Sequence, residues 1–135
     1  MPENPQALCK QALVSIPERL GKDAHLQWQG RRLTCCFLVG VDETPFYFDV
    51  EQGRIVAVTQ GPILMRSWDF ALKAPADAWL GYWAAVPKPW YHDLLALSKA
   101  GKLTIEGNLH PLMSNLQYIK DLLALPRGSV PGGES

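Results

Sequence analysis

The chain has 135 residues, of which 47% are hydrophobic, and its 13 Lys and Arg residues balance 13 Asp and Glu residues. This length corresponds to one domain that can bury a core without disulfides or metal ions. A formal net charge of zero creates no global field that would attract nucleic acid or an anionic membrane, so we expect no nucleic-acid partner. The basic residues are also scattered, with only Arg31 and Arg32 adjacent, which disfavours nucleic-acid binding and leaves only a local patch as a basis for it.

The three cysteines are Cys9, Cys35 and Cys36. Neighbouring strand residues point to opposite faces, so Cys35 and Cys36 are poor disulfide partners, and no CxxC spacing occurs. Free thiols indicate a reducing compartment. The first residues do not follow a secretory-signal pattern, the last ones do not form a peroxisomal address, and no apolar stretch is long enough to span a bilayer. We therefore expect a cytoplasmic protein without stable membrane insertion.

A first helix is expected near the start of the chain, because apolar residues recur there at helical spacing. Those that share one face are Leu8, Ala12, Leu13 and Ile16. Ser15 and Glu18 match a capping box, with Pro17 in a tolerated first-turn position. We expect a helix of about three turns, followed by a short second helical turn that ends at Gly21.

Between His25 and Lys73 the hydrophobic period changes to two, which is typical of strands. The alternating segments are residues 25–30, 33–40, 46–50, 54–60 and 67–73. Turn-forming Gly, Asp and Pro residues separate them. The pattern predicts five short strands in a largely antiparallel meander.

The helical period returns after these strands. Pro75 suits the start of a helix over residues 75–83, and a second helix over residues 90–100 is expected to end at Gly101. Leu103–Glu106 alternates again and predicts the last strand of the sheet.

A strongly apolar helix is expected after Asn108, which is a plausible N-cap. Its stripe consists of Leu109, Leu112, Met113, Leu116, Ile119, Leu122 and Leu123. A helix with such a stripe needs an apolar surface to cover. The composition of the last ten residues offers nothing to bury, so we expect a domain over residues 1–125 and a disordered tail over residues 126–135.

Three motifs in this order resemble the sterol carrier protein type 2 family. The segment FYFDVEQGRIVAV resembles the hairpin of that family, and SWDFALKAPADAWLGYW resembles its strand and following helix. The segment HDLLALSKAGKLTIEGNLHPLMSNLQYIKDL resembles its helix, Gly-Lys-Leu strand and amphipathic helix. The resemblance covers roughly residues 33–125. The WAAVPKPWYH segment is richer in Pro and Trp than the corresponding turn of the family.

The resemblance implies an α+β single domain, with a mainly antiparallel sheet of five to six strands and helices that cover one face. It also implies a tunnel between sheet and helices that holds an acyl chain or sterol, with the last helix as a wall or lid. We therefore expect the ligand-binding residues to be Phe48, Phe70, Trp79, Trp83, Leu94, Leu112, Met113 and Leu116.

The function expected from this resemblance is non-enzymatic binding or transfer of a lipid-like small molecule, without cofactor or metal. Candidate ligands are a fatty acyl derivative, a sterol-like lipid, a quinone or a phospholipid. The alternative is an interaction module that forms a homodimer or docks on a lipid-metabolising enzyme through an apolar surface. An exposed patch around Trp79 to Trp90 would favour that alternative. From the pattern alone, the stripe of the last helix is more often ordinary core than a ligand wall.

The sequence gives little support to an enzymatic function. His92 and Asp93 are neighbours on an expected helix, so their side chains diverge by about 100° and form no dyad by themselves. His25 and His110 lack partners at metal-ligand spacing, and there is no glycine-rich phosphate loop.

Overall fold

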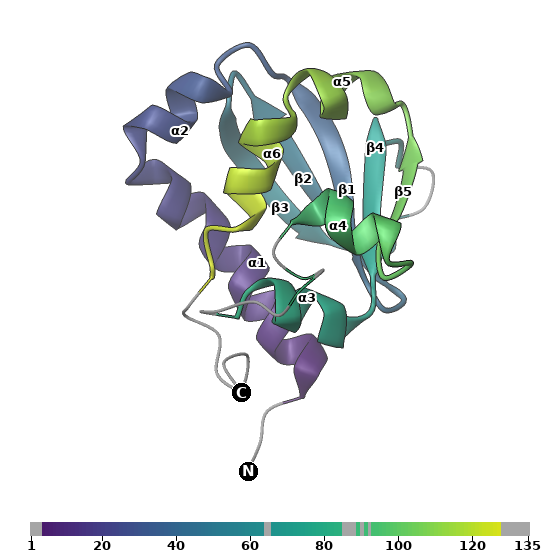
Figure 1. The fold of residues 1–135 in the computed structure, drawn as a ribbon. Helices are drawn as coiled ribbons and strands as arrows, with labels where there is room; N and C mark the ends of the chain where they lie inside the picture. Colours follow the sequence, from purple (N-terminus) through teal and green to yellow (C-terminus); the bar gives the residue numbers. More distant parts are fainter. Residues whose placement is uncertain (1–3, 64–65, 85–88, 90, 92, 128–135) are drawn as a thin grey trace.

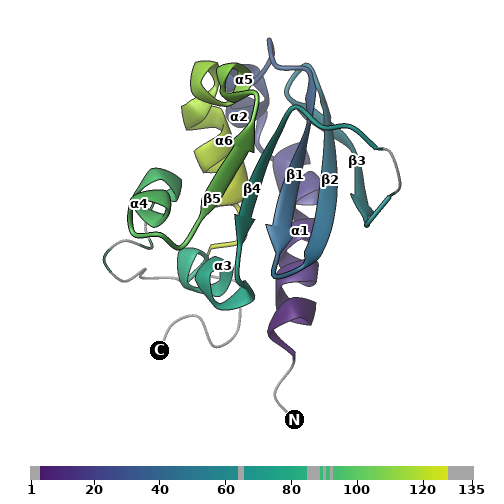
Figure 2. The same cartoon turned by 90° about the vertical axis from the view of Figure 1, so that its right-hand side faces the viewer.

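The computed structural model describes residues 4–63, 66–84, 89, 91 and 93–127. Its elements, in chain order, are α1 (Pro5–Gly21), α2 (Ala24–Gln29), β1 (Cys35–Val41), β2 (Thr44–Glu51), β3 (Arg54–Gln60), β4 (Phe70–Ala74), α3 (Ala76–Tyr82), α4 (Leu94–Lys99), β5 (Thr104–Gly107), α5 (Leu109–Ser114) and α6 (Leu116–Leu123). The strands form one sheet, and the labelled helices lie on one side of it (Figures 1 and 2). This α+β architecture confirms the predicted fold class.

The strands lie in the order β3-β2-β1-β4-β5. Three of the neighbouring pairs are antiparallel, so the mainly antiparallel sheet is confirmed, but β4 pairs with β1 in parallel. The predicted simple meander is therefore wrong at β4. The Asp69 amide donates to the Cys36 carbonyl over 2.7 Å, and the Asp69 carboxylate accepts from the Cys36 amide over 2.9 Å. These two bonds hold the start of β4 beside β1 instead of at the free edge of β3.

Residues 25–30 were predicted as a strand, and this prediction is wrong because they form α2. The Asp23 carboxylate accepts a hydrogen bond from the Leu26 amide over 3.0 Å and so caps this short helix. Leu26 is buried, whereas Trp28 is 59% exposed. The segment has only two large apolar residues, so its period-two pattern is weak evidence for a strand. The N-cap Asp23 instead favours a helix.

Helix α1 runs without interruption through Pro17, so the predicted second start at Ser15 is also wrong. The Ser15 hydroxyl donates to the Ala12 carbonyl over 2.7 Å and does not cap a new helix. The buried residues of α1 are Cys9, Ala12, Leu13, Ile16 and Leu20. This continuous buried face, which packs on the core, offsets the backbone bond that Pro17 cannot make.

The C-terminal segment is two helices and not the single helix expected from its stripe. The Asn108 side chain accepts from the His110 amide over 3.1 Å, which confirms Asn108 as the N-cap of α5. The helical path breaks at Asn115, whose side-chain amide donates to the Pro111 carbonyl over 3.0 Å. Because of the break, the stripe no longer faces one direction: Ile119 is fully buried, whereas Met113 is 48% exposed.

The end of the described chain lies close to α3. The Arg127 guanidinium donates to the Tyr82 carbonyl over 2.9 Å, and Pro126 is buried. The described structure thus continues two residues beyond the expected domain boundary at residue 125. The remainder of the expected tail, residues 128–135, lies outside the described residues.

Two glycines, Gly101 in the turn between α4 and β5 and Gly107 at the end of β5, provide a test of this fold. Gly101 and Gly107 both have positive φ, 78° and 93°. A Cβ on Gly101 would meet no atom within 4 Å, whereas one on Gly107 would lie 2.6 Å from the Asp69 carbonyl oxygen. We expect Gly101→Ala to lower the free energy of unfolding by about 1–2 kcal/mol, from backbone strain alone. We expect Gly107→Ala to lower it by about 3 kcal/mol or more, because the steric clash adds to that strain. Urea unfolding of both variants measures the difference, and equal losses would contradict the close approach of β5 to β4.

Candidate lipid-binding site

The inner face of the sheet is built around three stacked phenylalanine rings. Phe48 on β2 pairs with Phe37 on β1, and Phe37 pairs with Phe70 on β4. The ring centroids are 5.0 Å and 5.3 Å apart, and the planes are within 10° of parallel. All three rings are fully buried. The row ends on β5 at Gly107, the partner of Phe70, where no side chain continues the stack.

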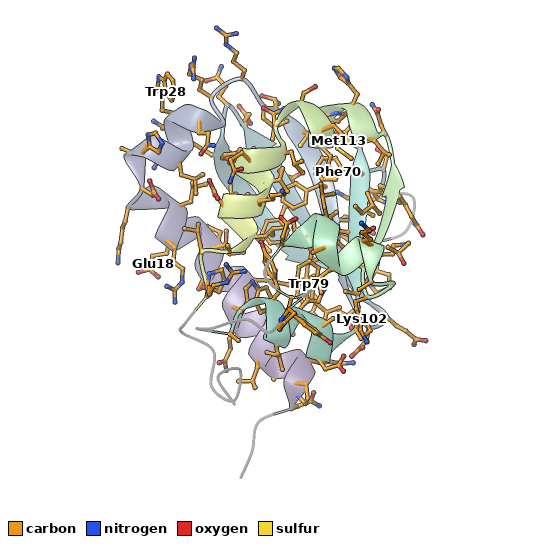
Figure 3. All side chains as sticks on the ribbon, in the orientation of Figure 1. Glu18, Trp28, Phe70, Trp79, Lys102 and Met113 are labelled. Carbon is orange, nitrogen blue, oxygen red and sulfur yellow. The ribbon has the colours of Figure 1, made fainter. Side chains whose placement is uncertain are left out.

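The structure brings most of the expected ligand-binding residues together. Phe48, Phe70, Trp79, Trp83, Leu94 and Leu112 belong to one buried cluster with Phe37. They come from β2, β4, α3, α4 and α5, so the cluster occupies the space between sheet and helices. Leu116 is partly buried against the cluster, and Met113 lies on the surface of α5. Figure 3 shows Phe70 and Met113 at the end of the sheet where α5 contacts β4.

The aromatic residues of α3 hold the C-terminal half of α6. The indole of Trp83 donates to the Leu123 carbonyl over 2.6 Å, and the Tyr82 hydroxyl donates to the Lys120 carbonyl over 3.0 Å. Trp79 stacks on Trp83 with centroids 5.6 Å apart, and its indole donates to the Gly40 carbonyl over 2.9 Å. These bonds satisfy the polar groups of the large rings inside the core. They also connect α6 to the sheet through α3.

Tyr118 holds the N-terminal half of α6, and the sequence analysis did not identify it. Its hydroxyl donates to the Gly53 carbonyl over 2.7 Å, and its ring lies against Gly30 so closely that a Cβ there would clash. Both glycines belong to turns, after α2 and between β2 and β3. Gly30 and Gly53 were visible in the sequence as turn residues, but their role in admitting one tyrosine ring depends on tertiary packing.

Helix α5 is held more weakly than α6. Leu112 is its only buried residue, and Leu109 and Met113 are 43% and 48% exposed. The Asn108 amide donates to the Asp69 carbonyl over 2.7 Å and fixes the start of the helix. A segment with one buried apolar anchor opens at a lower free-energy cost than one with four buried residues and three aromatic hydrogen bonds. Of the two C-terminal helices, α5 is therefore the one better placed to move away from the sheet.

The interior carries no charge among the described residues, because no Asp, Glu, Lys, Arg or His is buried there, and the polar groups of its Tyr and Trp rings are hydrogen-bonded. The Lys120 ammonium and Asp93 carboxylate form an ion pair of 2.8 Å between α6 and the start of α4, at the rim of the core. Lys73 pairs with Glu106 over 3.0 Å on the opposite face of the sheet, so it does not line the helix-covered interior. An interior of this kind suits an uncharged, apolar ligand portion.

The described cysteine thiols are poor nucleophiles. Burial raises the pKa of the Cys9 and Cys35 thiols to about 12, and the nearby carboxylates of Asp42 and Asp69 act in the same direction. Burial also raises the pKa of Cys36, against a hydrogen bond from Arg66 that lowers it. Within the described parts of the chain, no three His, Cys, Asp or Glu residues are placed to hold a metal ion. His92, the neighbour of Asp93, lies outside the described residues.

Solved structures show what this arrangement resembles. Sterol carrier protein 2 matches with a TM-score of 0.68 and 14% identity, over 87% of this chain and 95% of that one. This chain has the fold of sterol carrier protein 2.

Two further structures support that fold. The UbiJ-SCP2 ubiquinone synthesis protein matches with a TM-score of 0.57 and 18% identity, over 93% of this chain and 95% of that one. A hypothetical protein of Thermus thermophilus, described as a possible sterol carrier protein, matches with a TM-score of 0.58 and 13% identity, over 88% and 87%. No family model and no curated protein matches the sequence. No helix among the described residues has the length and hydropathy needed to cross a bilayer.

The raised thiol pKa values generate a prediction. At pH 8, a thiol with a pKa of about 12 is ionised roughly a thousandfold less than one in an unfolded chain, so Cys9 and Cys35 should react correspondingly slowly with a disulfide reagent. Because both folded-state pKa values lie above the unfolded value, the free energy of unfolding should fall as pH rises from about 8.5 toward 12. Labelling followed by peptide mass spectrometry measures both thiols. Rapid modification of Cys9 in native protein would contradict its burial.

Proposed function

We propose that this protein binds an apolar small molecule between its sheet and helices, without catalysing a reaction on it. The observation that carries the proposal is the sterol carrier protein 2 fold built around a charge-free aromatic interior. The proposed ligand-contacting residues are the eight predicted from the sequence. Phe48, Phe70, Trp79, Trp83, Leu94 and Leu112 supply the interior, while Leu116 and Met113 flank the entrance beside α5.

Entry of the ligand involves movement of α5 away from β4. Exposing Leu112 would cost about 2–3 kcal/mol, which is the transfer free energy of one leucine side chain. Burying about ten methylene groups of a ligand would return roughly 8 kcal/mol before association costs of several kcal/mol. For ten methylene groups the balance corresponds to millimolar or weaker affinity, so micromolar affinity requires a ligand that buries more apolar surface. This reversible range suits a carrier that must also release its ligand.

The ligand class that we propose is a single-chain or polycyclic lipid-like molecule: a fatty acyl derivative, a sterol-like lipid, a quinone or a phospholipid. The neighbour named as a ubiquinone synthesis protein supports the inclusion of a quinone. The cytoplasm remains the proposed location.

Met113 and Val14 provide a matched test, because both are apolar and about half exposed, at 48% and 50%, but lie on α5 and α1. Each Trp substitution should change the free energy of unfolding by less than about 1 kcal/mol, as is usual for surface positions. Met113→Trp should change the affinity for a fluorescent fatty-acid probe about fivefold, because partial burial of the indole beside the ligand contributes roughly 1 kcal/mol. Val14→Trp should leave the affinity unchanged.

The measurement is titration of the fluorescent probe, followed by displacement with oleate, cholesterol and a prenylated quinone. Wild-type protein that binds no probe would contradict ligand binding. Equal behaviour of the two Trp variants would contradict the placement of the site beside α5.

The second candidate function is an interaction module, and exposed Leu109 and Met113 on α5 favour it. The surface expected for this role around Trp79 and Trp83 does not exist in the described part of the segment, because both side chains are fully buried; Trp90 lies outside the described residues. Native mass spectrometry of gently purified protein separates the two functions. Bound lipid on a monomer supports the carrier, whereas a lipid-free homodimer or complex supports the module.

A further inference from the structure

Strand β3 forms one edge of the sheet, and the described structure places no further strand beside it (Figure 2). Its residues, Arg54–Gln60, include no Lys and no Pro, two residue types that often protect an edge strand from pairing with another chain. A register shift lies opposite Asp49 and Val50, and residues 57–60 beyond it pair regularly with β2. This regular stretch is therefore open to a further strand.

One hydrogen bond identifies the backbone groups of β3 that point away from the sheet. The Gly61 amide donates to the Pro45 carbonyl over 2.8 Å, directly beyond the last pair of β2 and β3. Hydrogen-bonded and non-hydrogen-bonded pairs alternate along an antiparallel ladder. Residues 57 and 59 therefore turn their N–H and C=O groups toward β2, whereas Val58 and Gln60 turn theirs outward, where the described structure has no partner strand.

There is space beside this edge on the side of the sheet that α1 covers. A hollow of about 350 Å³ lies between the start of β3 and the end of α1, and Pro17, Leu20 and Ile55 are among its lining residues. A second hollow of about 250 Å³ lies at the other end of β3, where Ala7 and Gln60 contribute to its lining. An added strand would extend its side chains on this face over hollows with apolar groups in their walls.

Positive charge gathers at the start of β3. A hollow of about 650 Å³ there is lined by Arg31, Arg54 and Glu51, among others. Neither arginine forms an ion pair with a described residue, so two guanidinium groups face one carboxylate. An added chain with carboxylates at this end would be attracted to it. Strand β3 itself has no acidic residue, so the same strand of a second copy would not supply those carboxylates.

We propose that β3 accepts an extended, acidic segment of a partner protein as an additional, antiparallel strand. Antiparallel pairing prevails in this sheet and is slightly more stable per residue than parallel pairing. The segment alternates apolar residues, which face α1, with polar residues, and it carries carboxylates at its C-terminal end beside Arg54. Main-chain hydrogen bonds supply the affinity of such an added strand, and its side chains supply specificity. This binding goes beyond the proposed small-molecule binding and uses a different part of the molecule.

The experiment titrates the full chain with an acetylated and amidated octapeptide of alternating valine and threonine, in which glutamates replace the last two threonines. We expect binding that salt weakens. Hydrogen exchange followed by NMR should show new protection of the Val58 and Gln60 amides, whereas the amides of residues 57 and 59, which already face β2, should change little.

N-methylated peptides test the main-chain pairing itself. Residues that pair directly across an antiparallel ladder share a face, and Val58 packs on the buried cluster below the helices. The valines of the peptide should therefore lie on that face and turn their N–H groups toward β3. Methylation of the valine nitrogens should abolish binding, whereas methylation of the threonine nitrogens should leave it nearly unchanged.

A pair of charge-neutralising variants tests the acidic end of the peptide. Arg54→Gln should weaken binding of the acidic peptide about threefold, as expected for loss of one exposed ion pair. Lys102→Gln is the control, because Lys102 is also exposed but lies far from Trp28, which lines the same hollow as Arg54 (Figure 3). A peptide with glutamine in place of glutamate should bind the wild-type protein and Arg54→Gln equally.

The proposal is overturned if the acidic peptide does not bind, if the valine-methylated peptide binds as well as the unmodified one, or if the new protection appears in α5 and not in β3. Equal loss of affinity in Arg54→Gln and Lys102→Gln would also overturn it. Dimers of the protein alone with protected Val58 and Gln60 amides would overturn it too, because the occupant of the edge would be a second copy. A protein that binds the peptide but no fatty-acid probe leaves this inference intact while the proposed small-molecule binding fails.

Discussion

The stack of Phe48, Phe37 and Phe70 is the constraint on which the rest of the structure depends. Three large rings in register across β2, β1 and β4 make one face of the sheet too apolar to remain in water. The described helices therefore gather on that face, as Figures 1 and 2 show. The opposite face needs less cover, and a small cluster of Leu38, Tyr47 and Ala71 under the β3–β4 connection suffices there.

Helix α6 is anchored to the rest of the molecule by more contacts than α5. We relate this difference in packing to the proposed entry of the ligand. Trp83, Tyr82 and Tyr118 attach α6 at both ends through hydrogen bonds to backbone carbonyls. Helix α5 crosses the end of the phenylalanine row, where β5 offers only Gly107, and Leu112 is its one buried side chain. We therefore expect α5 to open more easily than α6, at the point where the row of rings ends. That geometry is the physical basis of our proposal for ligand entry.

The sequence predicted β1 and β2 well, because alternate residues of each strand enter one buried cluster: Phe37, Val39 and Val41, and Phe46, Phe48 and Val50. The sequence-based prediction was wrong where side-chain hydrogen bonds or the sheet topology, and not the hydrophobic period, determine the structure. Asp23 turned residues 25–30 into a helix, and Asp69 placed β4 parallel to β1. The stripe after Asn108 predicted helical structure over the right residues, but it did not predict the break at Asn115, where the side-chain amide bonds locally to the Pro111 carbonyl. Exposure of Met113 follows from that break and could not be inferred from spacing alone.

The central claim is that α5 opens over an apolar interior while α6 stays in place. Hydrogen exchange of residues 109–114 and 116–123, with and without saturating oleate, tests it most directly. The account predicts faster exchange in α5 than in α6 without ligand, and a change in exchange on oleate binding that is confined to α5 and the adjoining end of β4. Equal protection of the two helices, or a response to oleate that leaves α5 unchanged, would contradict it.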